Sequence, residues 1–131
     1  MDEAEVARAA ALNRAFDAAH HRVMDGPRWY LPFMAVAPAQ QGRGSGSALM
    51  RHTLDRVIPR GAPCYLDSVD ERNLPFYEQL GFRIAETGMV PGSPLRTWAL
   101  RRGCIGRADR SLFVVAETSH KGGLKRRSIK V

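Results

Sequence analysis

The chain has 131 residues, of which 44% are hydrophobic and 25% are charged, and these values fit a single globular domain. It shows neither an apolar run of roughly 20 residues nor a basic, apolar start, so we expect a cytoplasmic protein rather than a membrane or secreted one. The net charge is +7, but seven basic and two acidic residues lie after residue 102, so the excess belongs to a tail. Such tails are usually solvated, which does not favour a nucleic-acid partner.

The first predicted elements are a helix and a strand. Ala-rich sequence with spaced apolar positions predicts a helix from residue 2 to about residue 24, which Gly26 and Pro27 would end. The aromatic and apolar run WYLPFMAV, residues 29–36, predicts a buried strand. Because Pro32 cannot donate to a strand ladder, we expect a bulge or a break in pairing there.

A glycine-rich loop then leads into a second helix. The apolar residues after the loop recur at helical spacing and would form one buried face; they are Met50, Leu54, Val57 and Ile58. The sequence Pro-Arg-Gly at residues 59–61 should end this helix.

The remaining body alternates strand and helix. Residues 63–69, PCYLDSV, predict a second strand. The stretch NLPFYEQLG predicts a short helix with Asn73 as its N-cap, Pro75 in its first turn and Gly81 at its end. FRIAETGMV and LRTWALRR predict two further strands around the turn PGSP. This order of elements predicts an α/β (α+β) fold.

The loop GRGSGS joins the first strand to the second helix. A helix that begins this way offers unpaired backbone N–H groups and the positive end of its dipole to an anion. Gly42, Gly44 and Gly46 would let a phosphate approach the backbone, and Arg43 would add charge. A plain flexible turn would also explain the glycines. The loop has no lysine of a P-loop, and its glycine spacing differs from the dinucleotide fingerprint.

Two separate motifs point to one family. The first is Gln41-x-x-Gly44-x-Gly46, preceded by Val36-x-Pro38, and the second is NLPFYEQLGFR, which begins at Asn73. Together they resemble the acyl-coenzyme A loop and the N…FYxxxGF segment of the GNAT superfamily of N-acetyltransferases. The resemblance covers residues 29–102 and implies a mixed sheet with flanking helices.

The resemblance also implies roles for residues. Backbone amides of the loop would wrap the pyrophosphate of acetyl-CoA, the strand before it would pair with the pantetheine arm, and an amide near Met34 or Ala35 would stabilise the oxyanion. Tyr77 would protonate the leaving thiolate. The implied acetyl-CoA-binding residues are Met34, Val36, Gln41, Gly42, Arg43, Gly44, Ser45, Gly46 and Asn73. Asn73 would equally serve as a plain helix cap, and Tyr77 as a packed aromatic.

The sequence names no general base, no nucleophile and no metal site. The titratable residues near the predicted strands suit solvated or structural roles; they are Asp67, Asp70, Glu71, His20 and His21. Cys64 and Cys104 share no metal-type spacing, so we expect reduced thiols. The resemblance therefore implies direct attack of an amine on acetyl-CoA without a covalent intermediate or a metal.

The start of the chain departs from the family pattern. Only about 28 residues precede the first predicted strand, so a GNAT-like domain at residues 1–102 would be N-terminally shortened, with a basic extension at 103–131. The exposed strand edge would be covered by a tail strand at 111–117 or by a second copy in a homodimer, or the shortened product would be impaired. The function is then an acetyltransferase acting on an amine or, alternatively, a degenerate non-enzymatic acyl-CoA-binding or interaction module.

Overall fold

A computed structural model of the chain describes residues 1–103, 112–118 and 124–129, the last two ranges through their backbone alone. The chain forms two compact units. One unit comprises residues 1–25 and 65–101, and the other comprises residues 26–64 and 102–131. Both units draw on distant parts of the sequence, so each depends on tertiary contacts. The division into a domain at 1–102 and an extension remains a prediction.

The first unit begins with the long helix α1 (Glu3–Val23), as the Ala-rich stretch predicts. Asp2 caps it by a reciprocal pair of hydrogen bonds with Glu5, each 2.7 Å long. Acidic residues in the first turn and basic ones in the last complement the helix dipole. The helix ends at Met24, whose amide still donates to the carbonyl of His20.

Three strands form the sheet of this unit: β2 (Cys64–Ser68), β3 (Arg83–Met89) and β4 (Arg96–Arg102). The central β4 lies between β3 and β2. β3 and β4 are antiparallel, with a bulge between Ile84 and Glu86, and the predicted PGSP turn joins them. The most deeply buried large side chains of the described residues are Tyr65, Leu66 and Leu100, which form the centre of the core.

The short helix α3 (Leu74–Gln79) follows β2 but is not capped as predicted. A 3₁₀ turn, η3 (Glu71–Asn73), precedes it, so Asn73 is already helical and its side chain makes no capping hydrogen bond. Asn73 therefore stands at the predicted N-cap position of α3 but does not cap the helix, because a capping side chain needs an extended backbone at that residue. Asp70 caps the turn instead by accepting from the amide of Arg72 at 3.0 Å. Gly81 ends the helix with a φ of +89°, as predicted.

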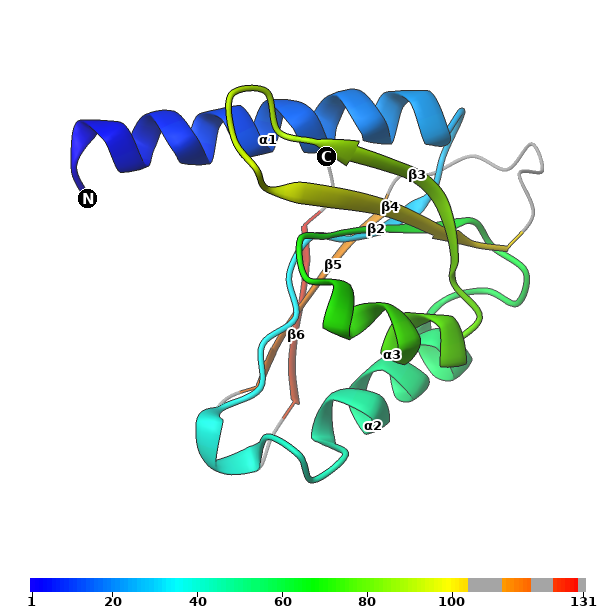
Figure 1. Cartoon of the computed structure of the whole chain (residues 1–131). Helices are drawn as coiled ribbons and strands as arrows, with labels where there is room; N and C mark the ends of the chain where they lie inside the picture. The colour runs from blue at the N-terminus through cyan, green and yellow to red at the C-terminus, as the bar shows by residue number, and fades with distance from the viewer. Residues whose placement is uncertain (104–111, 119–123, 130–131) are drawn as a thin grey trace. The chain divides into compact units, whose positions relative to one another are not determined.

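The two helices of the first unit cover opposite faces of β3 and β4, with α1 on one side and α3 on the other (Figure 1). Strand alternation explains why both faces can be filled. Residues 97–100 of β4 are all buried, although neighbouring side chains point to opposite sides.

The second unit contains β1 (Trp29–Leu31), which is shorter than predicted. It stops before Pro32, and its residues are half-buried rather than buried. The expected break at Pro32 is therefore the end of the strand, because proline lacks the amide that would continue the ladder. β1 pairs in parallel with β5 (Leu112–Thr118), which pairs antiparallel with β6 (Leu124–Ile129), so this sheet is mixed. Ser111, the first residue of the predicted tail strand, lies outside the described residues.

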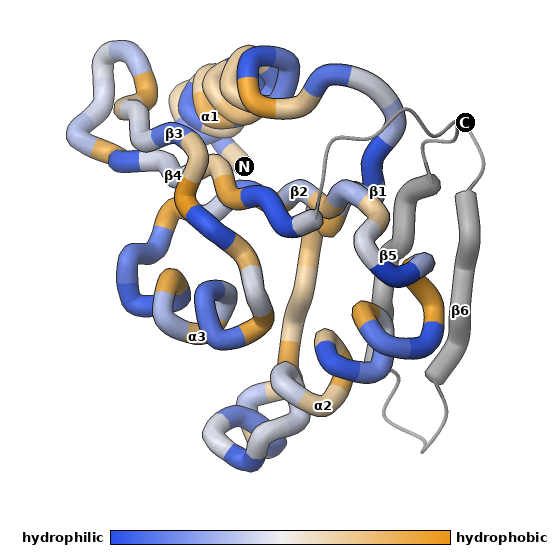
Figure 2. Tube along the Cα trace, turned by 90° about the vertical axis from the view of Figure 1, so that its right-hand side faces the viewer, coloured by the Kyte–Doolittle hydropathy of each residue, from blue (hydrophilic) through white to orange (hydrophobic). Residues whose placement is uncertain are grey.

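The same unit carries the glycine loop and its helix. After η1 (Pro38–Gln40) and the glycines, α2 (Ser45–His52) continues into a π-helical turn, η2 (Thr53–Val57). The hydroxyl of Thr53 donates to the carbonyl of Leu49 at 2.9 Å, at the point where the helix widens. Apolar residues lie in the middle of α2 and polar residues at its end, and Figure 2 colours them by hydropathy. Of the predicted buried face, Met50 and Leu54 are buried, whereas Val57 and Ile58 are half-buried.

Candidate active site

The glycine loop is shaped by local hydrogen bonds. The amide of Gln40 donates to the carbonyl of Ala37 at 2.8 Å, which forms the η1 turn. The side-chain Nε2 of Gln41 reaches back to the carbonyl of Val36 at 3.0 Å. This contact ties the loop to the extended segment before it. Gln41 therefore positions the loop through its side chain and is exposed itself.

Two glycines of the loop adopt a backbone conformation that other residues rarely take. Gly42 has a φ of +72°, and Gly44, the N-cap of α2, has a φ of +79°. Within the described part of the chain, a Cβ at either position would meet no atom within 4 Å. Glycine is therefore required by the left-handed backbone and not by crowding. The open space leaves the backbone accessible to a ligand.

The start of α2 supplies hydrogen-bond donors beside this open space. The amide of Ala48 makes the first intrahelical bond, to the carbonyl of Gly44 at 2.9 Å, so the amides of residues 45–47 precede it. No acidic residue stands in the first turn of α2, and Arg43 is exposed next to it. Donors, dipole and charge all favour an anion here. These features fit the pyrophosphate of acetyl-CoA.

Tyr77 lies in the first unit, on α3, among aromatic rings. Its ring contacts Phe76 and Phe82 edge to face, with centroids 5.2 and 6.3 Å away. Its hydroxyl makes no hydrogen bond with any residue that the structure describes. Burial raises the pKa of Tyr77, so its phenol stays protonated at neutral pH. A half-buried, protonated phenol is chemically suited to donate a proton.

The remaining predicted residues are placed as follows. Met34 and Val36 are half-buried in the extended segment after β1, and Asn73 is exposed at the start of α3. The structure groups residues 34–46 in the second unit, and Asn73 and Tyr77 in the first.

The candidate bases mostly have structural partners. Asp70 forms an ion pair with Arg72 at 2.7 Å, and hydrogen bonds from the guanidinium and from the backbone amide of Arg72 lower the pKa of Asp70. Asp67 accepts a hydrogen bond from the hydroxyl of Tyr65 at 2.5 Å. The ring of His20 stacks on Tyr65 with centroids 4.0 Å apart. The structural roles that the sequence suggests suit Asp70 and His20.

Two interactions were not anticipated from the sequence. Arg22 on α1 forms an ion pair with Glu86 on β3, 64 residues away, and no local pattern signals it. The hydrogen bond between Tyr65 and Asp67 joins positions i and i+2 of a strand, which lie on the same face. Strand alternation could therefore have found the second interaction but not the first.

Cys64 does not suit a nucleophile. It is buried, its Sγ lies 3.5 Å from the carbonyl of Ala62, and burial raises the pKa of its thiol to about 11. Arg102 opposes this shift only in part. The thiol is thus protonated at neutral pH and unreactive. Cys104 lies outside the described residues.

The model of the acetyltransferase (GNAT) family matches residues 2–82, which contain the first motif, all of the second motif except its last residue, and the helices α1, α2 and α3. The chain belongs to the GNAT acetyltransferase family. Its α+β fold, with helices on a mixed sheet, agrees with the predicted fold class. Membership also accounts for a glycine loop that lacks the features of the two commoner phosphate motifs.

Two relatives align with this GNAT chain over short segments. An uncharacterized N-acetyltransferase of Schizosaccharomyces pombe is 34% identical over 58 residues, which is 44% of this chain and 24% of that protein. A glucosamine 6-phosphate N-acetyltransferase of Trypanosoma brucei brucei is 44% identical over 59 residues, which is 43% of this chain and 38% of that protein. The matches therefore span well under half of these curated relatives.

Two solved structures align over a larger part of this chain than the curated relatives do. A Corynebacterium glutamicum structure described as histone acetyltransferase HPA2 and related acetyltransferase has a TM-score of 0.48 and 26% identity, and the match covers 60% of this chain and 43% of that one. A nourseothricin acetyltransferase has a TM-score of 0.47 and 23% identity, with 57% and 49% covered.

Two features are absent from the described part of the chain. None of its helices combines the length and apolarity that crossing a bilayer requires. Among the same residues, no three His, Cys, Asp or Glu side chains gather in a way that could hold a metal ion.

Proposed function

We propose that the chain transfers an acetyl group from acetyl-CoA to an amine by direct attack. The amine nitrogen forms a bond to the thioester carbonyl carbon, and the carbon–sulfur bond breaks. The coenzyme A thiolate takes a proton, and the acetylated nitrogen loses one to water. We propose no covalent enzyme intermediate, because neither the sequence motifs nor the described residues offer an activated nucleophile near the predicted site.

The observation that carries the proposal is the loop at residues 41–46. Its left-handed glycines leave open space among the described residues, and the amides of residues 45–47 precede the first intrahelical hydrogen bond of α2. Membership of the GNAT family supplies the anion that such a loop would hold, the pyrophosphate of acetyl-CoA. We assign the binding of this group to the backbone from Gln41 to Gly46, with Arg43 adding charge. Met34, Val36 and Asn73 would contact the pantetheine arm.

We assign the proton transfer to Tyr77. Its raised pKa keeps the phenol protonated, and a thiolate whose thiol has a pKa of about 8.5 is a strong enough base to take that proton in a shielded site. The amide of Met34 or Ala35 would stabilise the oxyanion that forms during the attack.

The proposed acceptor is an amine, and assays with a panel of different amines would identify its chemical class. One relative is named as a glucosamine 6-phosphate N-acetyltransferase, so this amino sugar phosphate belongs in the first panel of acceptors. The short shared segment supports its inclusion, and turnover with it above that with simple alkylamines would assign an amino sugar phosphate as the acceptor class.

Calorimetry with acetyl-CoA tests the loop. Gly44→Val places a β-branched side chain where the backbone has a φ of +79° and should weaken acetyl-CoA binding at least tenfold. Gly61→Val is a matched control, because Gly61 has the same φ of +79° and the same open surroundings outside the loop. Equal affinity in both variants, or no binding by the parent protein at tens of micromolar, would contradict the proposal.

Turnover separates the two functions that the sequence suggests. Release of coenzyme A in the presence of an amine supports the acetyltransferase. Tight binding of acetyl-CoA without turnover, across a broad amine panel, would instead identify a non-enzymatic acyl-CoA-binding module.

A further inference from the structure

The two compact units of the chain carry opposite net charge. The unit of residues 1–25 and 65–101 holds seven basic and ten acidic residues, which gives a formal charge of −3. The unit of residues 26–64 and 102–131 holds thirteen basic and three acidic residues, which gives +10. Five of these basic residues and one of the acidic ones lie at 26–64, before the tail. The basic excess is therefore a property of the second unit and not of its tail alone.

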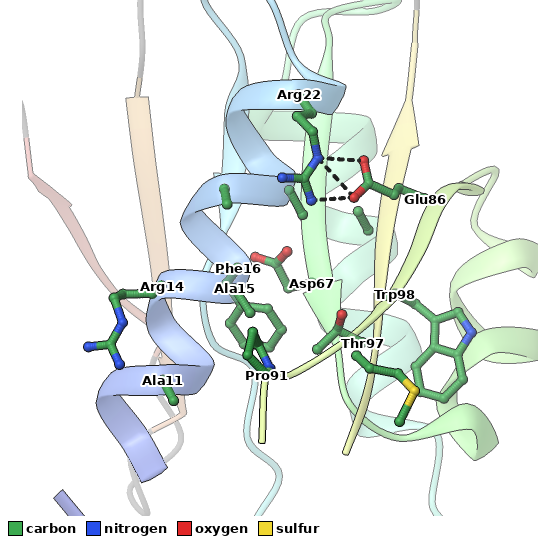
Figure 3. Close-up of a pocket in the computed structure, with 15 residues that line it drawn as sticks. Ala11, Arg14, Ala15, Phe16, Arg22, Asp67, Glu86, Pro91, Thr97 and Trp98 are labelled. Carbon is green, nitrogen blue, oxygen red and sulfur yellow. Dashed lines mark hydrogen bonds and ion pairs between the residues drawn. The ribbon is translucent and has the colours of Figure 1, made fainter. Parts of the chain in front are cut away.

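Two arginines of the first unit have acidic partners. Arg22 binds Glu86 through three hydrogen bonds at one end of a cavity of about 280 Å³ between α1 and the sheet, as Figure 3 shows. Arg72 forms an ion pair with Asp70. In both pairs the two opposite charges largely cancel, so these arginines offer little net charge to another molecule.

The second unit has an arginine surface without such partners, made of Arg51, Arg56 and Arg60. The three residues lie on α2, on η2 and in the turn that follows, and all are exposed. None of them forms an ion pair with a residue that the structure describes. Asp55, the acidic residue of segment 26–64, forms no ion pair within that part of the chain either. The arginine surface therefore keeps a net positive charge.

The wide turn η2 affects how these arginines are arranged. In an α-helix, which has 3.6 residues per turn, positions five apart differ by about 140° around the axis. In η2 the amide of Ile58 donates to the carbonyl of Thr53, five residues back, so a turn there holds more residues. Arg51 and Arg56 are thereby closer to one side of the helix than α-helical geometry allows. Such π-helical turns occur often at functional sites, and the proposed acetyl transfer does not use this one.

The charge of this unit fits a polymer of phosphates. A DNA duplex carries one negative charge per about 1.7 Å of its axis, and the guanidinium of arginine binds a phosphate with two parallel hydrogen bonds. A bilayer surface fits less well, because helices that bind there combine basic residues with exposed apolar ones. Among the described residues, the exposed large hydrophobic side chains include none from α2 or η2. The observations therefore favour a nucleic acid over a membrane.

We propose that the arginine surface binds the phosphate backbone of a nucleic acid. Lys125, Arg126 and Arg127 lie on β6, an edge strand of the same unit, and their charges add to its positive field. Contacts to phosphates carry no sequence information, so the binding does not depend on base sequence. This activity goes beyond the proposed acetyl transfer and does not rest on it.

Fluorescence polarisation of a labelled DNA duplex of mixed sequence, about 20 base pairs long, tests the proposal on the full chain. The expected Kd at physiological salt is about 10⁻⁴ to 10⁻⁶ M, as is typical of binding without base recognition. Three phosphate contacts predict that the affinity falls at least about 40-fold between about 50 and 200 mM salt. No binding at the lower salt concentration, or an affinity that salt does not lower, would overturn the proposal.

Replacement of the three arginines of the surface by glutamine assigns the binding to this surface. The variant Arg51→Gln/Arg56→Gln/Arg60→Gln should bind the duplex at least about tenfold more weakly, and its salt dependence should have a slope smaller by about 3. Its affinity for acetyl-CoA should equal that of the parent. Arg51→Gln alone should lower the slope by about 1 and serves if the triple variant does not fold.

The matched control removes the same charge from the first unit. It replaces three exposed arginines of that unit by glutamine, namely Arg8, Arg83 and Arg96. Because this control has the same net charge as the surface variant, it should retain most of the affinity for the duplex. Equal losses in the two variants would show that only total charge matters and would refute the arginine surface.

Two other polyanions test the chemistry of the partner. Polyglutamate offers carboxylates, and vesicles of phosphatidylserine and phosphatidylcholine offer phosphates on a bilayer. Neither should displace the duplex when its concentration of negative charges matches that of the DNA. Displacement by polyglutamate would identify an acidic protein as the partner, and displacement by vesicles would identify a membrane, so either result would overturn the proposal.

Discussion

The glycine loop and the arginine surface are two candidate ligand sites of the second unit that are built in opposite ways. The loop presents backbone amides, and Gly42 and Gly44, which have no side chains, leave the backbone uncovered. The arginine surface presents long charged side chains on α2, on η2 and in the turn that follows. A site made of backbone needs glycines at fixed spacing and so leaves a compact motif in the sequence, whereas a site made of exposed charge tolerates many spacings and leaves none.

The largest expected effect separates chemistry from binding. Tyr77→Phe should lower turnover with a saturating amine by roughly 10²-fold, because the general acid is lost. Acetyl-CoA affinity should hardly change, and the free energy of unfolding should change by no more than about 1 kcal/mol, since the hydroxyl has no partner among the described residues. Turnover is measured by rapid-mixing kinetics under conditions in which the chemical step is rate-limiting. Turnover equal to that of the parent would return Tyr77 to a packing role.

A smaller effect tests whether the loop binds through its backbone. Arg43→Ala removes an exposed charge and should weaken acetyl-CoA binding by no more than about fivefold, as expected for solvent-exposed ion pairs. Calorimetry at two salt concentrations measures it, with Arg51→Ala in the last turn of α2 as the control. A loss larger than that of Gly44→Val would mean that the side chain, and not the backbone, holds the anion.

The smallest effect concerns the ion pair at the end of the cavity. Hydrogen bonds from Arg22 lower the pKa of Glu86 below its ordinary 4.5 in the folded chain. A group with a depressed folded pKa stabilises the fold above its unfolded pKa, and this contribution is lost as the pH falls through the folded pKa. The Arg22 side chain is 59% exposed, so the contribution is small.

Thermal unfolding of the parent and of Glu86→Gln at several pH values checks this. The parent should be slightly more stable at pH 7, and the difference should shrink as the pH falls below about 4.5 and the carboxylate is protonated. A difference that stays constant down to pH 2 would show that the pair acts through packing and not through charge.

Much of the local structure could be predicted from the sequence. The bounds of α1, β2, β3 and β4 follow the predicted segments closely, because each is marked by periodicity and by a cap or turn. Two predictions differ from the structure. Asp70 caps the 3₁₀ turn before α3, whereas Asn73 makes no capping hydrogen bond. β1 ends before Pro32 after three residues, although a strand of eight residues was predicted.

The candidate sites also differ in how much of each could be predicted from the sequence. The loop residues and Tyr77 were named from two motifs and the family resemblance that these motifs carry, and their assignment to acetyl-CoA and to proton transfer remains a prediction. The arginine surface was not anticipated, because the sequence places most of the excess charge after residue 102 and does not show which residues share a unit with that tail. The cavity under α1 was not anticipated either. Asp67 was noted only as a solvated or structural carboxylate, because nothing near it in the sequence indicates that α1 covers its strand.

The sequence by itself determined which segments form helices and strands, where the glycine loop lies and which family the motifs resemble. These properties depend on residues within a few positions of one another, whose backbone preferences act locally. Only the tertiary structure decided that Arg22 meets Glu86, that β5 pairs with β1 and that α1 leaves a cavity over Asp67. Those contacts join residues tens of positions apart, and they form only when burial of apolar surface brings the elements together.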